Sequence, residues 1–140
     1  DRHESMVEQI PMIPTKTNSP NSIGLVLPHM KGKIDGLSIR LSTINVAMLD
    51  VTFSSKNQTT VAEVNERMRQ AASASLQGAL GYSEENAVST DFSAHPASCV
   101  FDATQTKVTS GRLVKVVGWF DNEWGFSNRM LDTAQAMMTN

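Results

Sequence analysis

The feature that most constrains the fold is a pair of strand-like runs on either side of Ser110-Gly111. Residues 104–109 and 112–120 are rich in β-branched and aromatic side chains. A two-residue connection that ends in glycine is typical of a β-hairpin. The second run, Leu113–Phe120, is apolar on both faces, as expected for a strand with neighbours on both sides. The pattern predicts a hairpin whose second strand is central in a sheet.

Other segments also favour extended structure. Alternating apolar and polar residues predict a half-buried strand at Leu37–Thr43 and a second strand at Ala47–Phe53. Val88–Phe92 is predicted as a short strand. Ile10–Thr17 is punctuated by prolines, which argue against a helix and for an extended segment.

Helix signals occupy the remaining stretches. Ser19-Pro20 reads as an N-cap followed by a proline at the first helical position, which predicts a short helix over 20–27. Thr60 and Glu63 have the spacing of a capping box, so a helix is expected from residue 61 towards the Gly78–Gly81 region. A C-terminal helix is predicted over Ser127–Met138.

These elements predict an α+β fold, with a mixed, largely antiparallel sheet and helices packed on one face. The other sheet face could be solvated or an interface, and since several strands are apolar on both sides, we favour an interface for self-association. Residues 1–10 are poorly patterned and are expected to form a tail. The rest, residues 11–140, is expected to be one domain.

Composition excludes several function classes. The net charge of −2 offers no basic surface, so nucleic acid is not an expected partner. No apolar run is long enough to cross a membrane. The single cysteine is compatible with a reducing cytosol, and a cytoplasmic location is expected. The three histidines lack metal-ligand spacing, so no metal site is expected.

Five segments together resemble the phosphorylating glyceraldehyde-3-phosphate dehydrogenases. Trp119–Met130 reads W-F-D-N-E-W-G-F-S-N-R-M, similar to the family's W-Y-D-N-E-W-G-Y-S-N-R-M/V. The other four are similar to I-P-T-S-T, R-V-P-T-x-N-V, G-I-L-G-Y-T/S-E-E and V-S-S-D-F, in that order. They are Ile13–Thr17, Ile39–Val46, Gly78–Glu85 and Ser89–Phe92. They occur in family order and spacing from about Pro11 to Met138.

The resemblance implies part of an NAD-dependent oxidoreductase of glycolysis. Such an enzyme oxidises a sugar-phosphate aldehyde with inorganic phosphate and works as a homo-oligomer. Residues 11–140 would then be part of its catalytic and oligomerisation domain. A dinucleotide-binding domain is not expected within this chain, since no G-x-G-x-x-G-type turn is found in the 140 residues.

The resemblance also implies roles for individual residues. Arg40 matches the arginine that grips a substrate phosphate, and Thr17 matches a threonine of the attacking-phosphate site. Asn18 replaces the family's glycine beside that threonine, and because asparagine tolerates the left-handed conformation, the turn is expected to survive. Asn122 matches the asparagine that holds the nicotinamide carboxamide. Phe126 takes the place of an aromatic residue beside the nicotinamide.

Without the resemblance, these residues could also have purely structural roles. Arg40 could be a solvated or ion-paired arginine on a strand's polar face. Asn122 could cap the C-terminal helix. Phe126 could belong to the core. Cys99 does not match the family nucleophile and is interpreted as a structural, buried cysteine.

In enzymes of this family, a cysteine thiolate attacks the aldehyde carbon of the substrate, and a histidine activates that thiolate. The matching cysteine and histidine motifs are not found in the 140 residues, so no catalytic residue is assigned. The chain alone is therefore expected to be inactive and to bind NAD poorly. Three alternatives stay open: a non-catalytic self-association module derived from the enzyme, a part of an erythrose-4-phosphate dehydrogenase, and a decayed gene product.

Overall fold

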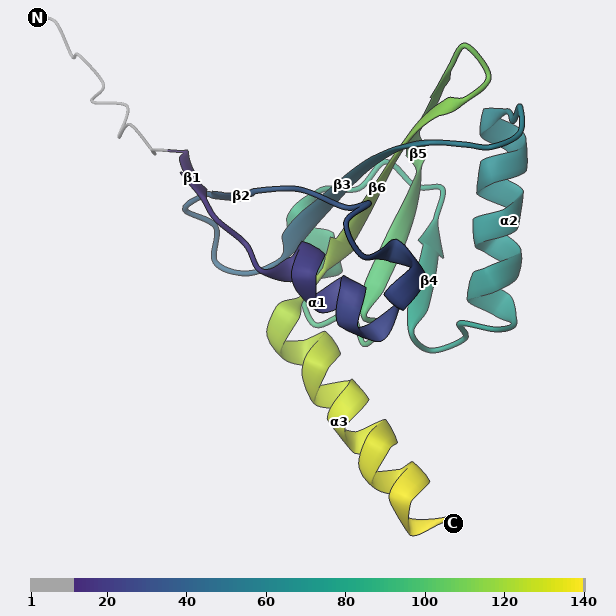
Figure 1. Ribbon diagram of the computed structural model, residues 1–140. Coiled ribbons are helices and arrows are strands. Elements are labelled where there is room, and N and C mark those ends of the chain that lie inside the picture. Colours follow the sequence, from purple (N-terminus) through teal and green to yellow (C-terminus); the bar gives the residue numbers. More distant parts are fainter. Residues whose placement is uncertain (1–11, 140) are drawn as a thin grey trace, which may run out of the picture. The chain divides into compact units, whose positions relative to one another are not determined.

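The computed structural model describes residues 12–139, and its elements are labelled in Figure 1. The tail expected at residues 1–10 lies outside the described residues, as does the start of the extended segment at Ile10 and Pro11. The chain divides into two compact units, Asp1–Ile44 and Asn45–Asn140. Each unit is described by itself.

The first unit contains a small antiparallel sheet and two short helices. Its strands pair Ile13 with Arg40 and Thr15 with Ser38. Its elements are β1 (Ile13–Thr15), α1 (Ser19–Val26), the 3₁₀ helix η1 (Pro28–Met30) and β2 (Ser38–Arg40). The predicted extended segment is thus confirmed at residues 13–15, and the predicted short helix is confirmed with a start one residue earlier.

The strand expected at Leu37–Thr43 is shorter than predicted. It covers only Ser38–Arg40, and its apolar face is exposed, with Ile39 at 57%. The expectation of a half-buried strand was therefore wrong for this unit. β2 has β1 as its sheet neighbour, and two short strands give each other little cover.

The second unit is built on a four-stranded sheet in the order β3-β6-β5-β4. The strands pair antiparallel, except that β4 and β5 are parallel. Their bounds are Ala47–Ser54 for β3, Leu80–Ser83 for β4, Cys99–Thr109 for β5 and Leu113–Phe120 for β6. β6 is an inner strand, which confirms the prediction from its two apolar faces. The α+β fold with a mixed, mostly antiparallel sheet is also confirmed.

The hairpin between β5 and β6 turns at Ser110-Gly111, as predicted. Both residues have positive φ, 51° and 68°, and the Arg112 amide donates to the Thr109 carbonyl at 3.2 Å. This is the geometry of a type I′ turn, whose twist matches that of the flanking strands. Glycine fits the second position because it has no Cβ to clash at positive φ.

Helix α2 (Val61–Ser73) packs along β4 and β5 (Figure 1). The predicted capping box is present: the Thr60 hydroxyl accepts from the Glu63 amide at 3.2 Å, and the Glu63 carboxylate accepts from the Thr60 amide at 3.0 Å. Val64 and Met68 face the sheet and are half-buried. On the same helix, the Asn65 side-chain amide donates to the Ala103 carbonyl at 3.1 Å.

Two predictions between α2 and β5 need correction. The segment read as a strand at Val88–Phe92 contains a 3₁₀ helix, η2 (Ser89–Phe92). The reason is local, because the Asp91 carboxylate accepts from the Val88 amide at 2.8 Å and closes a turn. Strand β4 was read only as the end of the preceding helix, which in fact ends at Ser73.

The C-terminal helix α3 (Asn122–Met138) begins five residues earlier than the predicted Ser127. Its N-cap is Asp121, which directly follows Phe120, the last residue of β6. The buried cluster beside this junction contains Phe92, Ala97 and Val100, with Val46 and Trp119 packed against it. The rings of Phe92 and Trp119 stack with centroids 5.6 Å apart. This buried cluster therefore lies beside the start of α3, where Gly125 approaches Ala97.

Candidate functional site

The residues expected at the substrate phosphate lie in the first unit. Arg40 ends β2, opposite Ile13, and its side chain is exposed. Thr17 follows the other end of β1, two residues after Thr15. Four residues of extended chain span about 13 Å, so Thr17 and Arg40 belong to opposite ends of this small sheet. The first unit presents them as two separate polar positions.

Thr17 and Asn18 form the entry to α1. The Thr17 Oγ1 lies 2.9 Å from the Ser19 Oγ and accepts from the Ser19 amide at 3.2 Å. Asn18 is the N-cap residue, with φ −90° and ψ 0°, and it makes no side-chain cap hydrogen bond. The left-handed conformation considered for Asn18 was therefore wrong. A residue other than glycine fits this turn without strain.

The residues expected at the nicotinamide lie at the start of α3, in the second unit. Asn122 is the first residue of the helix, and Phe126 follows one turn later. Residues four apart share one face of a helix, so the carboxamide and the ring lie on the same side. Both side chains are exposed, Phe126 at 65%. The interpretation of Phe126 as a core residue therefore does not hold in this chain.

The start of α3 is fixed by Asp121, not by Asn122. The Asp121 Oδ1 accepts from the Trp124 amide at 3.0 Å, and its carbonyl accepts from the Gly125 amide at 2.9 Å. The interpretation of Asn122 as the helix cap was thus wrong. Aspartate is as good a cap as asparagine. Asp121 was a residue that sequence reasoning missed, although an aspartate before an acidic first turn is an available signal.

The second oxygen of Asp121 has different partners. Oδ2 accepts from the Asn45 side-chain amide at 3.1 Å and from the Ala94 backbone amide at 2.9 Å. Asp121 is 5% exposed. Hydrogen bonds from the Trp124 and Ala94 amides stabilise the charged form and lower the pKa of this carboxyl group. It is therefore ionised at neutral pH.

A close backbone contact also holds the first turns of α3. A Cβ atom at Gly125 would lie 3.0 Å from the Ala97 carbonyl oxygen, so a side chain there would push the helix away. One turn further, the Arg129 guanidinium donates to the Gly78 carbonyl. From Met130 to Met138 the helix residues are exposed. The helix is thus anchored near Asn122 and Phe126.

The exposed part of α3 presents an apolar hollow of about 320 Å³. It is lined mainly by apolar side chains, which are Phe126, Met130, Ala134 and Met137, together with Arg129 and Thr133. Phe126 is the residue expected beside the nicotinamide. It is also part of an apolar surface that no other residue in the described chain covers. Such a surface on a single helix favours packing against another body.

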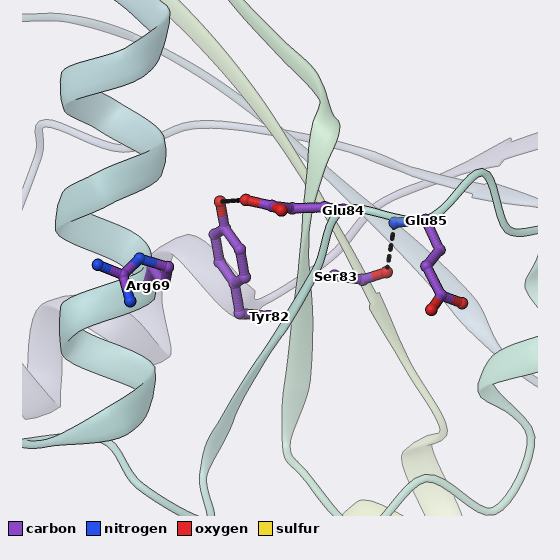
Figure 2. A pocket seen from close by; sticks show the side chains of 5 residues that line it. All are labelled: Arg69, Tyr82, Ser83, Glu84 and Glu85. Carbon is purple, nitrogen blue, oxygen red and sulfur yellow. Dashed lines mark hydrogen bonds between the residues drawn. The ribbon is translucent and has the colours of Figure 1, made fainter.

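A second hollow, of about 440 Å³, lies between α2 and β4 (Figure 2). Its polar groups largely satisfy one another. The Arg69 guanidinium donates to the Glu66 carboxylate at 2.8 and 2.9 Å, and the Tyr82 hydroxyl donates to Glu84 at 2.9 Å. Burial and this neighbouring carboxylate raise the pKa of Tyr82. We therefore assign this hollow no ligand.

Cys99 begins β5 and is half-buried. Burial raises the pKa of its thiol, which disfavours the reactive thiolate. Gly118 on β6 lies close by, since a Cβ built there would be 2.5 Å from the Cys99 Sγ. Sulfur thus fills space that a side chain at position 118 would need. This packing role agrees with the interpretation of Cys99 as a structural cysteine.

Residues 12–139 hold no group of three or more histidine, cysteine, aspartate or glutamate side chains placed to bind a metal ion. None of the helices within this range is long and apolar enough to cross a membrane.

Comparison with known proteins decides the family. Residues 4–122 match the family model described as the C-terminal domain of glyceraldehyde 3-phosphate dehydrogenase. The chain belongs to this family. The match extends through parts of both units and includes Thr17, Asn18, Arg40 and Asn122. The family resemblance drawn from the sequence motifs is therefore confirmed.

Bacterial glyceraldehyde-3-phosphate dehydrogenases are similar over nearly the whole chain. The protein of Cereibacter sphaeroides is 49% identical over 137 residues, which is 98% of this chain and 41% of the relative. The chromosomal protein of Cupriavidus necator and the protein of Pseudomonas aeruginosa are 53% and 52% identical over 126 residues, covering 90% of this chain and 37% of each relative. The chain thus spans about two fifths of these relatives.

Proposed function

We propose that this chain is part of an NAD-dependent, phosphorylating glyceraldehyde-3-phosphate dehydrogenase. It supplies contacts to the substrate phosphate and to the nicotinamide, and it is inactive by itself. The observation that carries the proposal is the family match over residues 4–122, combined with an exposed arginine and an exposed asparagine at the family's motif positions.

The phosphate contacts fall to Arg40, Thr17 and Asn18. A guanidinium group is always charged at neutral pH and matches phosphate oxygens with a planar fork of donors. Arg40 is the last residue of β2, and its side chain is exposed. Thr17 carries a hydroxyl that can donate to a second phosphate group, and Asn18 offers an exposed amide beside it.

The cofactor contacts fall to Asn122 and Phe126. A carboxamide side chain can donate to and accept from the carboxamide of a nicotinamide at once. These two hydrogen bonds would fix the orientation of the nicotinamide ring and therefore the face that receives the hydride. An aromatic ring one helical turn away supplies an apolar wall. Support comes from their common helix face and from the anchored first turns of α3.

Inactivity of the chain alone rests on the chemistry of the reaction. Oxidation of the aldehyde needs a thiolate to attack the carbonyl carbon and a base to take the thiol proton. The one cysteine of these 140 residues is Cys99, whose burial raises its pKa. The part of the enzyme that corresponds to the remaining three fifths of the relatives would supply the nucleophile and the dinucleotide site.

Complementation tests this proposal. The chain is mixed with the part of the Pseudomonas aeruginosa relative that precedes the matched segment, and NADH formation is followed with glyceraldehyde 3-phosphate, NAD and phosphate. We expect no turnover from either part alone and turnover from the mixture. Turnover by the chain alone, or none from a mixture that forms a complex, would contradict the proposal.

A matched pair of variants sharpens the test. Arg40→Lys keeps the charge but loses the bidentate fork, and should raise the KM for the sugar phosphate about tenfold, since a good charge-assisted bond is worth about 1.5–3 kcal/mol. Arg112→Lys, on the exposed hairpin turn, is the control and should leave KM unchanged. Running erythrose 4-phosphate beside the triose phosphate tests the alternative of an erythrose-4-phosphate dehydrogenase.

A second candidate function is self-association, favoured by the sheet. Leu49, Val51 and Phe53 share one face of β3 and are 47%, 37% and 44% exposed. A run of exposed apolar side chains on a regular sheet is typical of an interface. In the first proposal this surface would join subunits of the intact enzyme. In the second it would be the whole function of the chain.

A further inference from the structure

We infer that Asp121 is a positioning residue: its carboxylate ties the start of α3, and with it Asn122, to the chain at Asn45 and Ala94. This inference rests on the proposed role of Asn122 in holding the nicotinamide. The motif at Trp119–Met130 includes Asp121 but assigns it no such role. The inference follows from the hydrogen bonds and the backbone geometry around one buried carboxylate.

The two oxygens of Asp121 serve different purposes. Oδ1 accepts from the Trp124 amide and caps α3. Oδ2 accepts from the Asn45 side chain and the Ala94 amide, two segments far apart in the sequence. A helix cap needs only one acceptor. The second oxygen therefore does something that capping does not require.

Asn45 strengthens this tie. Its side-chain amide donates to the Ser93 hydroxyl at 2.8 Å as well as to Asp121. It is the first residue of the second unit, five residues after Arg40 in the sequence. The loop at 93–94, the entry to β3 and the start of α3 are therefore joined by one cluster of side chains.

The backbone at this cluster is strained. Val46 and Ala94 have φ of 65° and 56°, and each lies within one residue of a donor to Asp121. A left-handed valine is a genuine outlier, because its branched Cβ crowds the backbone. Such conformations are energetically unfavourable and persist only where the surroundings enforce them. The bonds to Asp121 and the core packing of Val46 supply that enforcement.

The geometry of Asn122 follows from this cluster. Asn122 is adjacent to Asp121 and is itself exposed, so its own side chain has little packing to orient it. The anchors of α3 lie in its first two turns. Loss of the Oδ2 bonds would let the first turn shift against the core. A misplacement of about 1 Å is enough to affect a bound cofactor strongly.

The first arm of the test uses this chain alone and three proteins: wild type, Asp121→Ser and Asp121→Ala. Serine keeps a cap for Trp124 but offers one short acceptor, which cannot also serve Asn45 and Ala94. Amide hydrogen exchange is followed by NMR. We expect Asp121→Ser to keep protection at Trp124 and lose it at Ala94 by about tenfold or more. Asp121→Ala should lose both.

The amide of Val117, inside the β5–β6 ladder, is the internal control and should keep its protection. Retained protection at Ala94 in Asp121→Ser would overturn the inference. Uniform loss of protection that includes Val117 would overturn it too, since Asp121 would then be required for the fold as a whole.

The second arm uses the complemented enzyme. Asp121→Ser should raise the KM for NAD about tenfold while the KM for phosphate stays within about twofold. Wild-type-like KM values would overturn the link to Asn122. If the wild-type mixture has no turnover, the proposed function fails, and the exchange experiment still decides whether Asp121 holds the cluster. The two failures are therefore distinguishable.

Discussion

At the scale of single residues, the contact between Gly118 and Cys99 shows how closely two strands can be fitted. Gly118 is buried on β6, and the space beside its Cα holds the Cys99 sulfur. The sulfur fills a gap that a larger pair of side chains would overfill. Cys99 is thus explained by packing, which is the commoner role of a buried cysteine.

Gly118→Ala should therefore destabilise the chain by about 1–3 kcal/mol, because the added Cβ meets the sulfur far inside contact distance. Urea unfolding measures this change. Cys99→Ala removes the sulfur and should recover most of the loss when the two changes are combined. If the double variant shows simple additivity of the two losses, the clash is not the cause.

Residue identity predicted some parts of the site and missed others. The motif positions of Thr17, Arg40, Asn122 and Phe126 were accessible from the sequence, and their roles stay predictions. The partners of Asp121 were not accessible. Asn45 and Ala94 are 76 and 27 positions away from it, and no local pattern links such distant segments. Their association depends on the tertiary fold, which brings the segment before β3 and the loop after η2 to the start of α3.

At the scale of elements, sequence patterns predicted the structure correctly where all the interacting residues lie within a few positions of one another. The capping box at Thr60 and Glu63 and the turn at Ser110-Gly111 each satisfy their own hydrogen bonds. Strand β4 was missed because its pairing is parallel to β5 and depends on residues nearly twenty positions away. The strand predicted at Val88–Phe92 was wrong because the Asp91 carboxylate accepts from the Val88 amide and closes a turn, which the apolar pattern does not reveal.

The cap of α2 gives an element-scale prediction. Thr60→Ala removes the acceptor for the Glu63 amide and should cost about 1 kcal/mol of unfolding free energy. Glu63→Gln keeps the reciprocal hydrogen bond and should cost less. Thermal unfolding followed by circular dichroism compares them. An equal loss in both variants would mean that the charge of Glu63, acting on the helix dipole, matters more than the box.

At the scale of the whole chain, two groups of apolar side chains stay exposed on the surface. The apolar face of β3 and the apolar side of α3 are both exposed, and each is part of a regular element. Small domains depend on every buried side chain for stability. The chain therefore has two surfaces on which binding of another body would add stability.

Self-association through the sheet is the prediction at this scale. Leu49→Thr combined with Phe53→Thr should shift the sedimentation distribution towards the monomer, because both changes remove apolar area from the proposed interface. Leu76→Thr is the matched control, since Leu76 is 46% exposed in the turn before β4. An unchanged distribution in the double variant, or an equal shift in the control, would count against a β3 interface.

The position of β3 at the border of its sheet has a practical consequence. Eight residues, from Ala47 to Ser54, leave one row of backbone groups without a partner strand in the described unit. This stretch has no proline, and its one charge, Asp50, is paired with Lys115. Unguarded edges recruit further strands and grow into fibres. Filaments should therefore form first in concentrated stocks of the chain.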